Sequence, residues 1–194
     1  THGHCFGMSE DFCRTVSNLC RGIGMEVKVI DDFLPQDLYE ELRKATVFNS
    51  ELPLYFQDEV SHYKEDDSFI AENWNWYATH QFYNYDRPMS KQCERIVQLF
   101  ADRLIDLKSL MRIKLNFYPH TETLREHGQH DDYTFPHHAA IYSLNTCDGF
   151  TRLSDGTKID SVGNRMLFFD GSTLHNSSTT TNAKGRYNIN FNYL

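Results

Sequence analysis

The sequence of 194 residues has no long apolar run, no basic run and no C-x-x-C pair. No segment approaches the ~20 apolar residues that a membrane span needs, so we expect no membrane protein. The first residues lack the basic-then-apolar order of a signal peptide. Acidic residues outnumber basic ones by 27 to 19, and without a basic cluster the net charge of −8 disfavours a nucleic-acid partner.

Five cysteines are present, an odd number, and this pattern indicates reduced thiols in a cytoplasmic protein. Cys5, Cys13 and Cys20 lie close in sequence with two histidines nearby. Their spacing matches no structural zinc site, so small buried residues or a loose tail are favoured over a metal site there.

Hydrophobic residues make up 40% and aromatic residues 14% of the chain, which is typical of a globular protein. There is no internal repeat, low-complexity segment or linker. We therefore predict a single domain over residues 25–194, preceded by an N-terminal extension, residues 1–24, with a possible short helix at 9–20.

Apolar spacing predicts the two helices in the first part of the chain and a run of short strands in the second part. A strand at 25–30 and a helix at 36–46 come first, then an aromatic strand or two within 73–83 and a long amphipathic helix at 89–107. Period-2 patterns then predict strands at 110–118, 137–145, 149–153, 157–162, 165–170 and 185–193. This order fits a mainly β fold with supporting α-helices, a jelly roll.

The last predicted strand has two distinct faces. Arg186, Asn188, Asn190 and Asn192 alternate with apolar residues, and alternate side chains of a strand point to opposite sides. Such a strand suits a sheet that packs on a core on one side and lines a polar cavity on the other.

An H-x-D pair, His130 and Asp132, is followed by His175 and then by Arg186. With 10 histidines and 27 acidic residues, one or two H-x-[D/E] pairs are expected by chance, and His120-x-Glu122 is a second. The pair gains weight from its context: His175 follows an apolar strand and a turn, and Arg186 lies on another strand. Two histidines and one carboxylate form the facial ligand set of non-haem Fe(II) sites, and arginine can pair with an anionic co-substrate.

Several segments also resemble the 2-oxoglutarate/Fe(II) dioxygenases, most closely their prolyl-4-hydroxylase-like branch. The resemblance covers about residues 25–194, that is, all of the predicted domain. It rests on Val29–Pro35, Leu115–Tyr118, Ile141–Asn145, Gly149–Thr151 and Gly163–Phe169, with Phe150 in place of the second glycine of the family's GGxT turn.

This resemblance implies a double-stranded β-helix, a cupin-like barrel, with Fe(II) held by His130, Asp132 and His175. It implies that Arg186 binds 2-oxoglutarate, with Tyr118 and Asn188 as further co-substrate contacts. O2 would be the second co-substrate, and the reaction would hydroxylate a protein or peptide side chain, such as prolyl, or a small molecule.

Two other functions remain as alternatives. A non-catalytic jelly-roll module for binding or assembly would be expected to have lost a ligand, and none is lost. A cupin-like metal enzyme without 2-oxoglutarate would not need Arg186.

The remaining histidines and tryptophans are not assigned to the metal or co-substrate site. We expect His120 and His127 to be solvated in a polar loop, and His137 and His138 to lie at the surface. Trp74 and Trp76 are expected to pack in the core rather than to form a substrate platform. Residues 47–86 and 119–129 are expected to shape the substrate entrance.

Overall fold

The computed structural model describes residues 26–61 and 73–194; the predicted helix at 9–20 and the Cys5, Cys13 and Cys20 cluster lie outside them. The elements are β1 Lys28–Ile30, α2 Gln36–Ala45, β2 Tyr55–Gln57, β3 Tyr77–Asn84, β4 Arg87–Pro88, α3 Cys93–Phe100, the 3-10 helix η1 Ala101–Arg103, β5 Leu110–Pro119, β6 His138–Ser143, β7 Phe150–Leu153, β8 Lys158–Asp160, β9 Arg165–Asp170, β10 His175–Ser177 and β11 Gly185–Tyr193. None of the described helices is long and apolar enough to cross a lipid bilayer.

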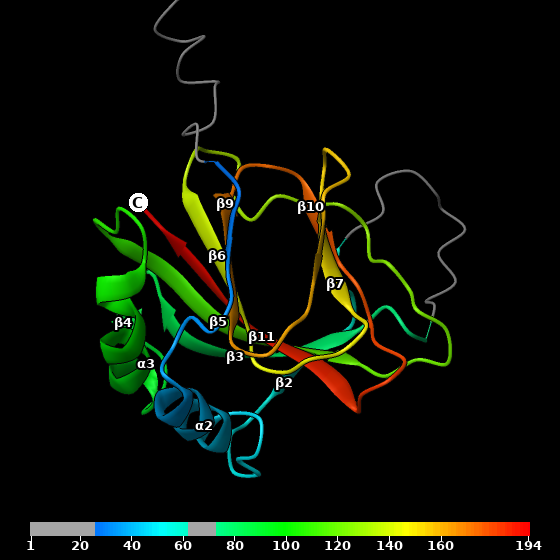
Figure 1. Ribbon diagram of the computed structural model, residues 1–194, viewed down its shortest axis with the longest axis horizontal. Coiled ribbons are helices and arrows are strands. Elements are labelled where there is room, and N and C mark those ends of the chain that lie inside the picture. The colour runs from blue at the N-terminus through cyan, green and yellow to red at the C-terminus, as the bar shows by residue number, and fades with distance from the viewer. Residues whose placement is uncertain (1–25, 62–72) are drawn as a thin grey trace, which may run out of the picture.

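Two antiparallel sheets face each other across the interior. The large sheet has the strand order β1-β9-β6-β11-β5-β3-β2, with β4 paired to β3, and the small sheet has the order β10-β7-β8. Helices α2 and α3 lie outside the large sheet, on the side away from β7 and β10 (Figure 1). The predicted mainly β jelly roll with supporting helices is therefore confirmed.

The main core lies between the helices and the large sheet. Leu42 of α2 and Phe100 of α3 pack there with Phe168, Ile189 and Phe191 of the sheet, and each of the five side chains is at most 1% exposed. Fully burying one such side chain stabilises the fold by about 1.5–3 kcal/mol. A smaller cluster lies between the two sheets and includes Ile141, Leu153 and Phe169.

Strand β11 has the two faces that its sequence predicts. Tyr187, Ile189, Phe191 and Tyr193 pack on the main core, whereas Arg186, Asn188, Asn190 and Asn192 are buried toward the interior between the sheets. The large sheet thus carries a core on one face and polar side chains on the other.

The predicted helix at 89–107 is too long. Met89 still continues the β3–β4 hairpin, because its N–H donates to the Phe82 carbonyl at 2.8 Å. Beyond η1 the backbone becomes extended at Leu104 and adopts a positive φ of 56° at Asp106. Leu104 and Leu107 still pack on the main core, so the apolar spacing continues past the end of the helix.

Candidate metal centre

His130, Asp132 and His175 converge in the space between the two sheets. Each offers one ligand atom, and these atoms all lie within 4.8 Å of one another. The main chains of His130 and His175 form an isolated bridge, with both N–H···O distances at 2.9 Å. His175 lies on β10, a three-residue strand that the sequence did not predict, and His130 lies in a loop that forms isolated bridges and no regular strand.

The two imidazoles are oriented for metal binding. The Nδ1 atom lies 3.4 Å from the Gly128 carbonyl in His130 and 2.9 Å from the Thr173 carbonyl in His175. Because a carbonyl oxygen only accepts, both Nδ1 atoms carry the proton, and both Nε2 lone pairs are left for a ligand. Burial and the neighbouring His175 lower the pKa of His130 to about 4, so its ring is neutral at pH 7.

The carboxylate of Asp132 is fixed by three donors. Arg112 Nη2 lies 2.6 Å from Oδ1, and the side-chain amides of Asn190 and Asn192 donate to Oδ2 at 3.0 and 2.8 Å. Burial opposes ionisation, but the Arg112 charge and the two amides hold the pKa of Asp132 well below its usual range. The carboxylate is therefore charged, and an Oδ1 lone pair remains free for a cation.

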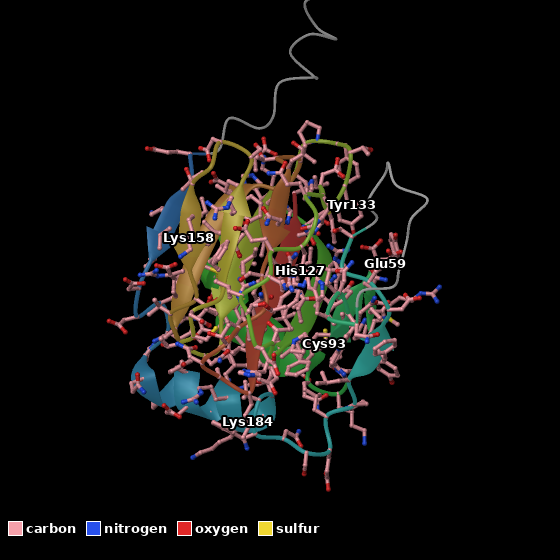
Figure 2. All side chains as sticks on the ribbon, turned by 90° about the vertical axis from the view of Figure 1, so that its right-hand side faces the viewer. Glu59, Cys93, His127, Tyr133, Lys158 and Lys184 are labelled. Carbon is pink, nitrogen blue, oxygen red and sulfur yellow. The ribbon has the colours of Figure 1, made fainter. Side chains whose placement is uncertain are left out.

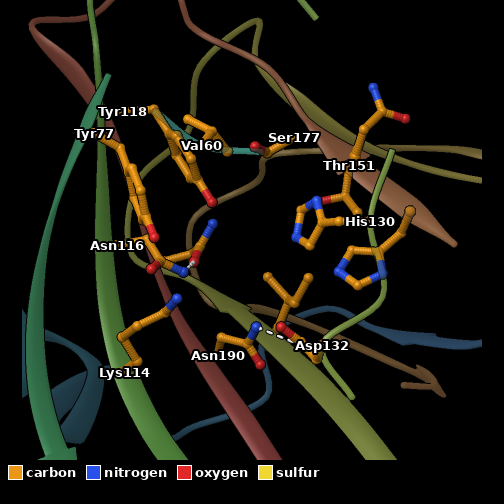
Figure 3. A pocket seen from close by; sticks show the side chains of 14 residues that line it. Val60, Tyr77, Lys114, Asn116, Tyr118, His130, Asp132, Thr151, Ser177 and Asn190 are labelled. Atoms are coloured by element: carbon orange, nitrogen blue, oxygen red, sulfur yellow. Dashed lines mark hydrogen bonds between the residues drawn. The ribbon is translucent and has the colours of Figure 1, made fainter. Parts of the chain in front are cut away.

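A polar pocket adjoins the three ligand residues, and its walls come from β3, β5, β7, β10 and β11 (Figure 3). Tyr118 and Asn188, which the family resemblance implies as co-substrate contacts, both line it. Asn116, which donates to Asn188 Oδ1 at 3.0 Å, lines it too. The carbonyl oxygens of the Asn116 and Asn190 side chains are buried without a hydrogen-bond partner, so the pocket offers acceptors for a ligand.

Arg186 is buried behind this pocket, which excludes a role in a surface salt bridge. Its Nε and Nη2 atoms donate to Ser161 Oγ at 2.6 Å and Thr151 Oγ1 at 2.8 Å, and its Nη1 is buried without a partner. The guanidinium carbon lies 5.3 Å from the centre of the Tyr118 ring. A Cβ atom at Gly149 would lie 2.7 Å from Arg186 Cδ, so the small residue of the Gly149–Thr151 turn makes room for the arginine.

The residues that the sequence analysis missed are Arg112, Lys114 and Asn116. All three lie on β5, on the face shared with Tyr118, and Lys114 and Asn116 line the pocket. Burial lowers the pKa of Lys114 to about 8. The period-2 pattern of residues 112–118 places these polar side chains on one face, so it was the signal that could have found them.

The expected solvated position of His127 is wrong. Its side chain is buried, with its ring centre 5.4 Å from those of Trp74 and Tyr118 and Nδ1 2.9 Å from Ser177 Oγ. In the view of Figure 2 it lies near the middle of the molecule, with Lys158 and Lys184 toward the margins. The loop around His127 pairs with residues 177–179, which draws the ring inward.

His137 is also buried, contrary to the surface position expected for it. Its Nδ1 lies 2.9 Å from the Phe135 carbonyl and its Nε2 lies 3.2 Å from Asn192 Nδ2. It therefore supports Asn192, a donor to Asp132. His138 is half-buried against the Tyr193 ring, and His120 is exposed as expected. Trp76 packs near Phe56 and Phe117 and Trp74 stacks on His127, but both are half-buried and lie outside the two core clusters, so the expected core packing is wrong.

We expect the metal-free protein to lose stability as pH falls below about 6.5. Burial lowers the pKa of His127 to about 3, so the unfolded chain takes up a proton at a pH where the folded chain does not. This difference costs about 2 kcal/mol of unfolding free energy at pH 5 relative to neutral pH. Urea unfolding of the wild type and of His127→Phe at pH 5 and pH 7.5 measures it. An equal pH dependence in both proteins would contradict the assignment to His127.

No protein-family model matches the sequence, and no curated protein is significantly similar to it. Solved structures are similar. A Pseudomonas putida prolyl-4-hydroxylase has 13% sequence identity and a TM-score of 0.59, with 93% of this chain and 97% of that chain covered. A Trichoplax adhaerens prolyl hydroxylase, solved with a hypoxia inducible factor peptide, has 15% identity and a TM-score of 0.58, with 97% and 94% covered.

A third similar structure is SnoN, a non-haem α-ketoglutarate-dependent epimerase from nogalamycin biosynthesis. It has 11% identity and a TM-score of 0.59, with 94% of this chain and 84% of that chain covered. At such identities the likeness shows the fold. The chain therefore has the fold of the 2-oxoglutarate/Fe(II) oxygenases, the double-stranded β-helix that the sequence resemblance implies.

Proposed function

We propose that this protein is a non-haem Fe(II), 2-oxoglutarate-dependent dioxygenase that hydroxylates a C–H bond. The observation that carries the proposal is the convergence of His130, Asp132 and His175 beside a polar pocket backed by the buried cation Arg186. When bound, Fe(II), 2-oxoglutarate and O2 supply the oxidising power, and succinate and CO2 are the co-products.

Different residues of the chain would bind the metal, bind the co-substrate and exclude water. His130, Asp132 and His175 would hold Fe(II) on one face and leave positions open, since three protein ligands do not fill its coordination sphere. Arg186 would bind the distal carboxylate of 2-oxoglutarate through its unpaired Nη1, with Tyr118 and Asn188 beside it. The walls of the pocket would keep bulk water from the reacting centre.

The substrate class that we propose is a peptidyl side chain, such as prolyl, or a small molecule. A surface depression supports an entrance for it, because residues of the two expected entrance segments line this depression: Asn73, Trp74, Trp76, Pro119, His120, Thr121, Glu122, Thr123 and Arg125. A non-catalytic jelly-roll module would leave the buried Arg186 Nη1 unexplained.

The experiment that tests the proposal is an anaerobic titration of the metal-free protein with Fe(II) and 2-oxoglutarate. A weak visible charge-transfer band is expected with the wild type and is expected to be absent in His130→Ala. His120→Ala is the matched control, because His120 belongs to the second H-x-[D/E] pair, is exposed and should leave the band unchanged. A folded wild-type protein without the band would contradict the proposal and favour a binding module.

Replacing Arg186 with methionine is expected to weaken 2-oxoglutarate binding by about 100-fold or more, with Fe(II) binding retained. Two charge-assisted hydrogen bonds to the distal carboxylate would be lost, each worth about 1.5–3 kcal/mol. Calorimetric titration of the anaerobic Fe(II)-loaded protein measures the change. Arg95→Met, which removes only an exposed ion pair with Glu41, is the control. Equal 2-oxoglutarate affinity in Arg186→Met and wild type would exclude Arg186 from the co-substrate site.

A further inference from the structure

Lys114 places a cation in the pocket itself, on the side of the metal ligands. Its side chain comes from β5, and the ammonium points into the pocket near Asn116 and Asn190 (Figure 3). Among the described residues it has no hydrogen bond or ion pair, and its Nζ lies 5.5 Å from the centre of the Tyr77 ring. The side chain is half-buried, and no anion among the described residues pairs with its ammonium.

The nearby carboxylate does not serve this purpose. Asp132 already pairs with Arg112 at 2.6 Å and accepts two side-chain amides. The Arg112–Asp132 pair is neutral as a unit, so Lys114 leaves the metal end of the pocket with an uncompensated positive charge. An anion bound beside the three ligand residues would neutralise that charge.

The pairing of β5 with β11 shows where each cation lies. Tyr118 pairs with Arg186, Asn116 with Asn188 and Lys114 with Asn190, in successive rungs on the same face. Asn190 donates to Asp132, so the Lys114 rung is at the metal end. Arg186 lies four residues farther along the strand pair, about 13 Å away along the backbone. Lys114 therefore lies at the metal end of the pocket, and Arg186 lies behind its other end.

We propose that Lys114 binds the carboxylate of 2-oxoglutarate that adjoins its keto group, while Arg186 binds the distal carboxylate. This assignment rests on the proposed function. A dianion with one carboxylate at each end matches one cation in the metal end of the pocket and a second cation behind its other end. The asparagines between them offer neutral hydrogen-bonding groups to the middle of the ligand. Lys114 would thus fix the orientation in which the co-substrate meets the metal.

Two ligands separate the roles of the two cations. 2-Oxoglutarate has both carboxylates, whereas 2-oxopentanoate, a 2-oxo acid of the same chain length, lacks the distal one. We expect Lys114→Met to weaken both ligands by the same factor of about tenfold or more, the loss of one charge-assisted hydrogen bond. Arg186→Met is expected to weaken 2-oxoglutarate alone. Calorimetric titration of the full chain loaded with Mn(II), which supports no turnover, gives the affinities.

The other outcomes overturn the assignment in distinguishable ways. If Lys114→Met weakens only 2-oxoglutarate, then Lys114 serves the distal carboxylate. If it weakens neither ligand, then the cation serves another anion, such as a carboxylate of the primary substrate. A wild-type protein that binds Mn(II) and neither 2-oxo acid would overturn the proposed function together with this assignment.

Weaker binding of the 2-oxo acids by Lys114→Met is not expected to arise from loss of the metal. Removing a positive charge near the metal ligands should leave Mn(II) affinity unchanged or raise it, and a separate Mn(II) titration of each variant verifies this. Lys114→Gln provides a second variant of polar character. A melting temperature equal to that of the wild type in either variant establishes that the fold is retained.

Discussion

Replacing Asp132 with asparagine is expected to reduce Fe(II) affinity by more than about 100-fold. This loss is larger than the one usually caused by mutating a residue that only hydrogen-bonds to a metal ligand. The amide keeps the size of the side chain but removes the negative charge that the site presents to a cation. Arg112, 2.6 Å from Oδ1 in the native protein, then faces the metal without a counter-charge, and so does Lys114. An anaerobic metal titration measures the loss.

The chain offers a matched control in the adjacent Asp131→Asn, which removes one carboxylate of the same loop and should leave the Fe(II) affinity within about twofold. Asp132→Asn should also lower the free energy of unfolding by about 3 kcal/mol, because the half-buried Arg112 loses its ionic partner. Similar Fe(II) affinities in both variants would remove Asp132 from the ligand set.

Replacing Asn164 with alanine is expected to destabilise the fold by about 3–5 kcal/mol. The Asn164 side chain makes three buried hydrogen bonds: Oδ1 accepts from Leu34 N–H at 2.9 Å and from the Tyr142 hydroxyl at 2.7 Å, and Nδ2 donates to the Leu34 carbonyl at 2.8 Å. Its φ of 65° is also unfavourable for alanine. This residue ties the chain that enters α2 to the start of β9. Urea unfolding at neutral pH measures the effect.

Two further variants divide this cost into its parts. Asn164→Gly removes the three hydrogen bonds but tolerates the positive φ, so it should be less destabilising than alanine by about 1 kcal/mol. Tyr142→Phe removes one hydrogen bond and should cost about 1 kcal/mol. If Asn164→Ala cost less than Tyr142→Phe, the side-chain amide would not be the tie that we infer.

Strand alternation carried most of what could be predicted from the sequence. Residues 185–193 alternate so strictly that both faces of β11 could be assigned, and the structure places one on the core and one on the polar interior. The H-x-D pair alone was no stronger than chance. Only its order with His175 and Arg186 singled it out from His120-x-Glu122, whose histidine is exposed in the structure.

The rest depends on contacts between distant segments. β10 has three residues, too few to show a period, and it forms because β7 pairs with it. His127 and His137 are in polar sequence surroundings, yet packing against Tyr118 and hydrogen bonding with Asn192 bury them. Arg112 could not be assigned to Asp132 either, because the two residues are 20 positions apart in the sequence and meet only in the folded chain.

Strand β11 also sets a limit on how this chain can vary. A deletion of Gly185, the first residue of β11, would exchange its two faces, bringing four polar side chains, Arg186 among them, into the core and four apolar ones toward the ligand pocket. Folding and ligand binding would then fail together. A substitution in this strand can alter folding or ligand binding separately, whereas a change of its length alters both. We therefore expect relatives of this protein to differ in residue type along β11 and to share its spacing.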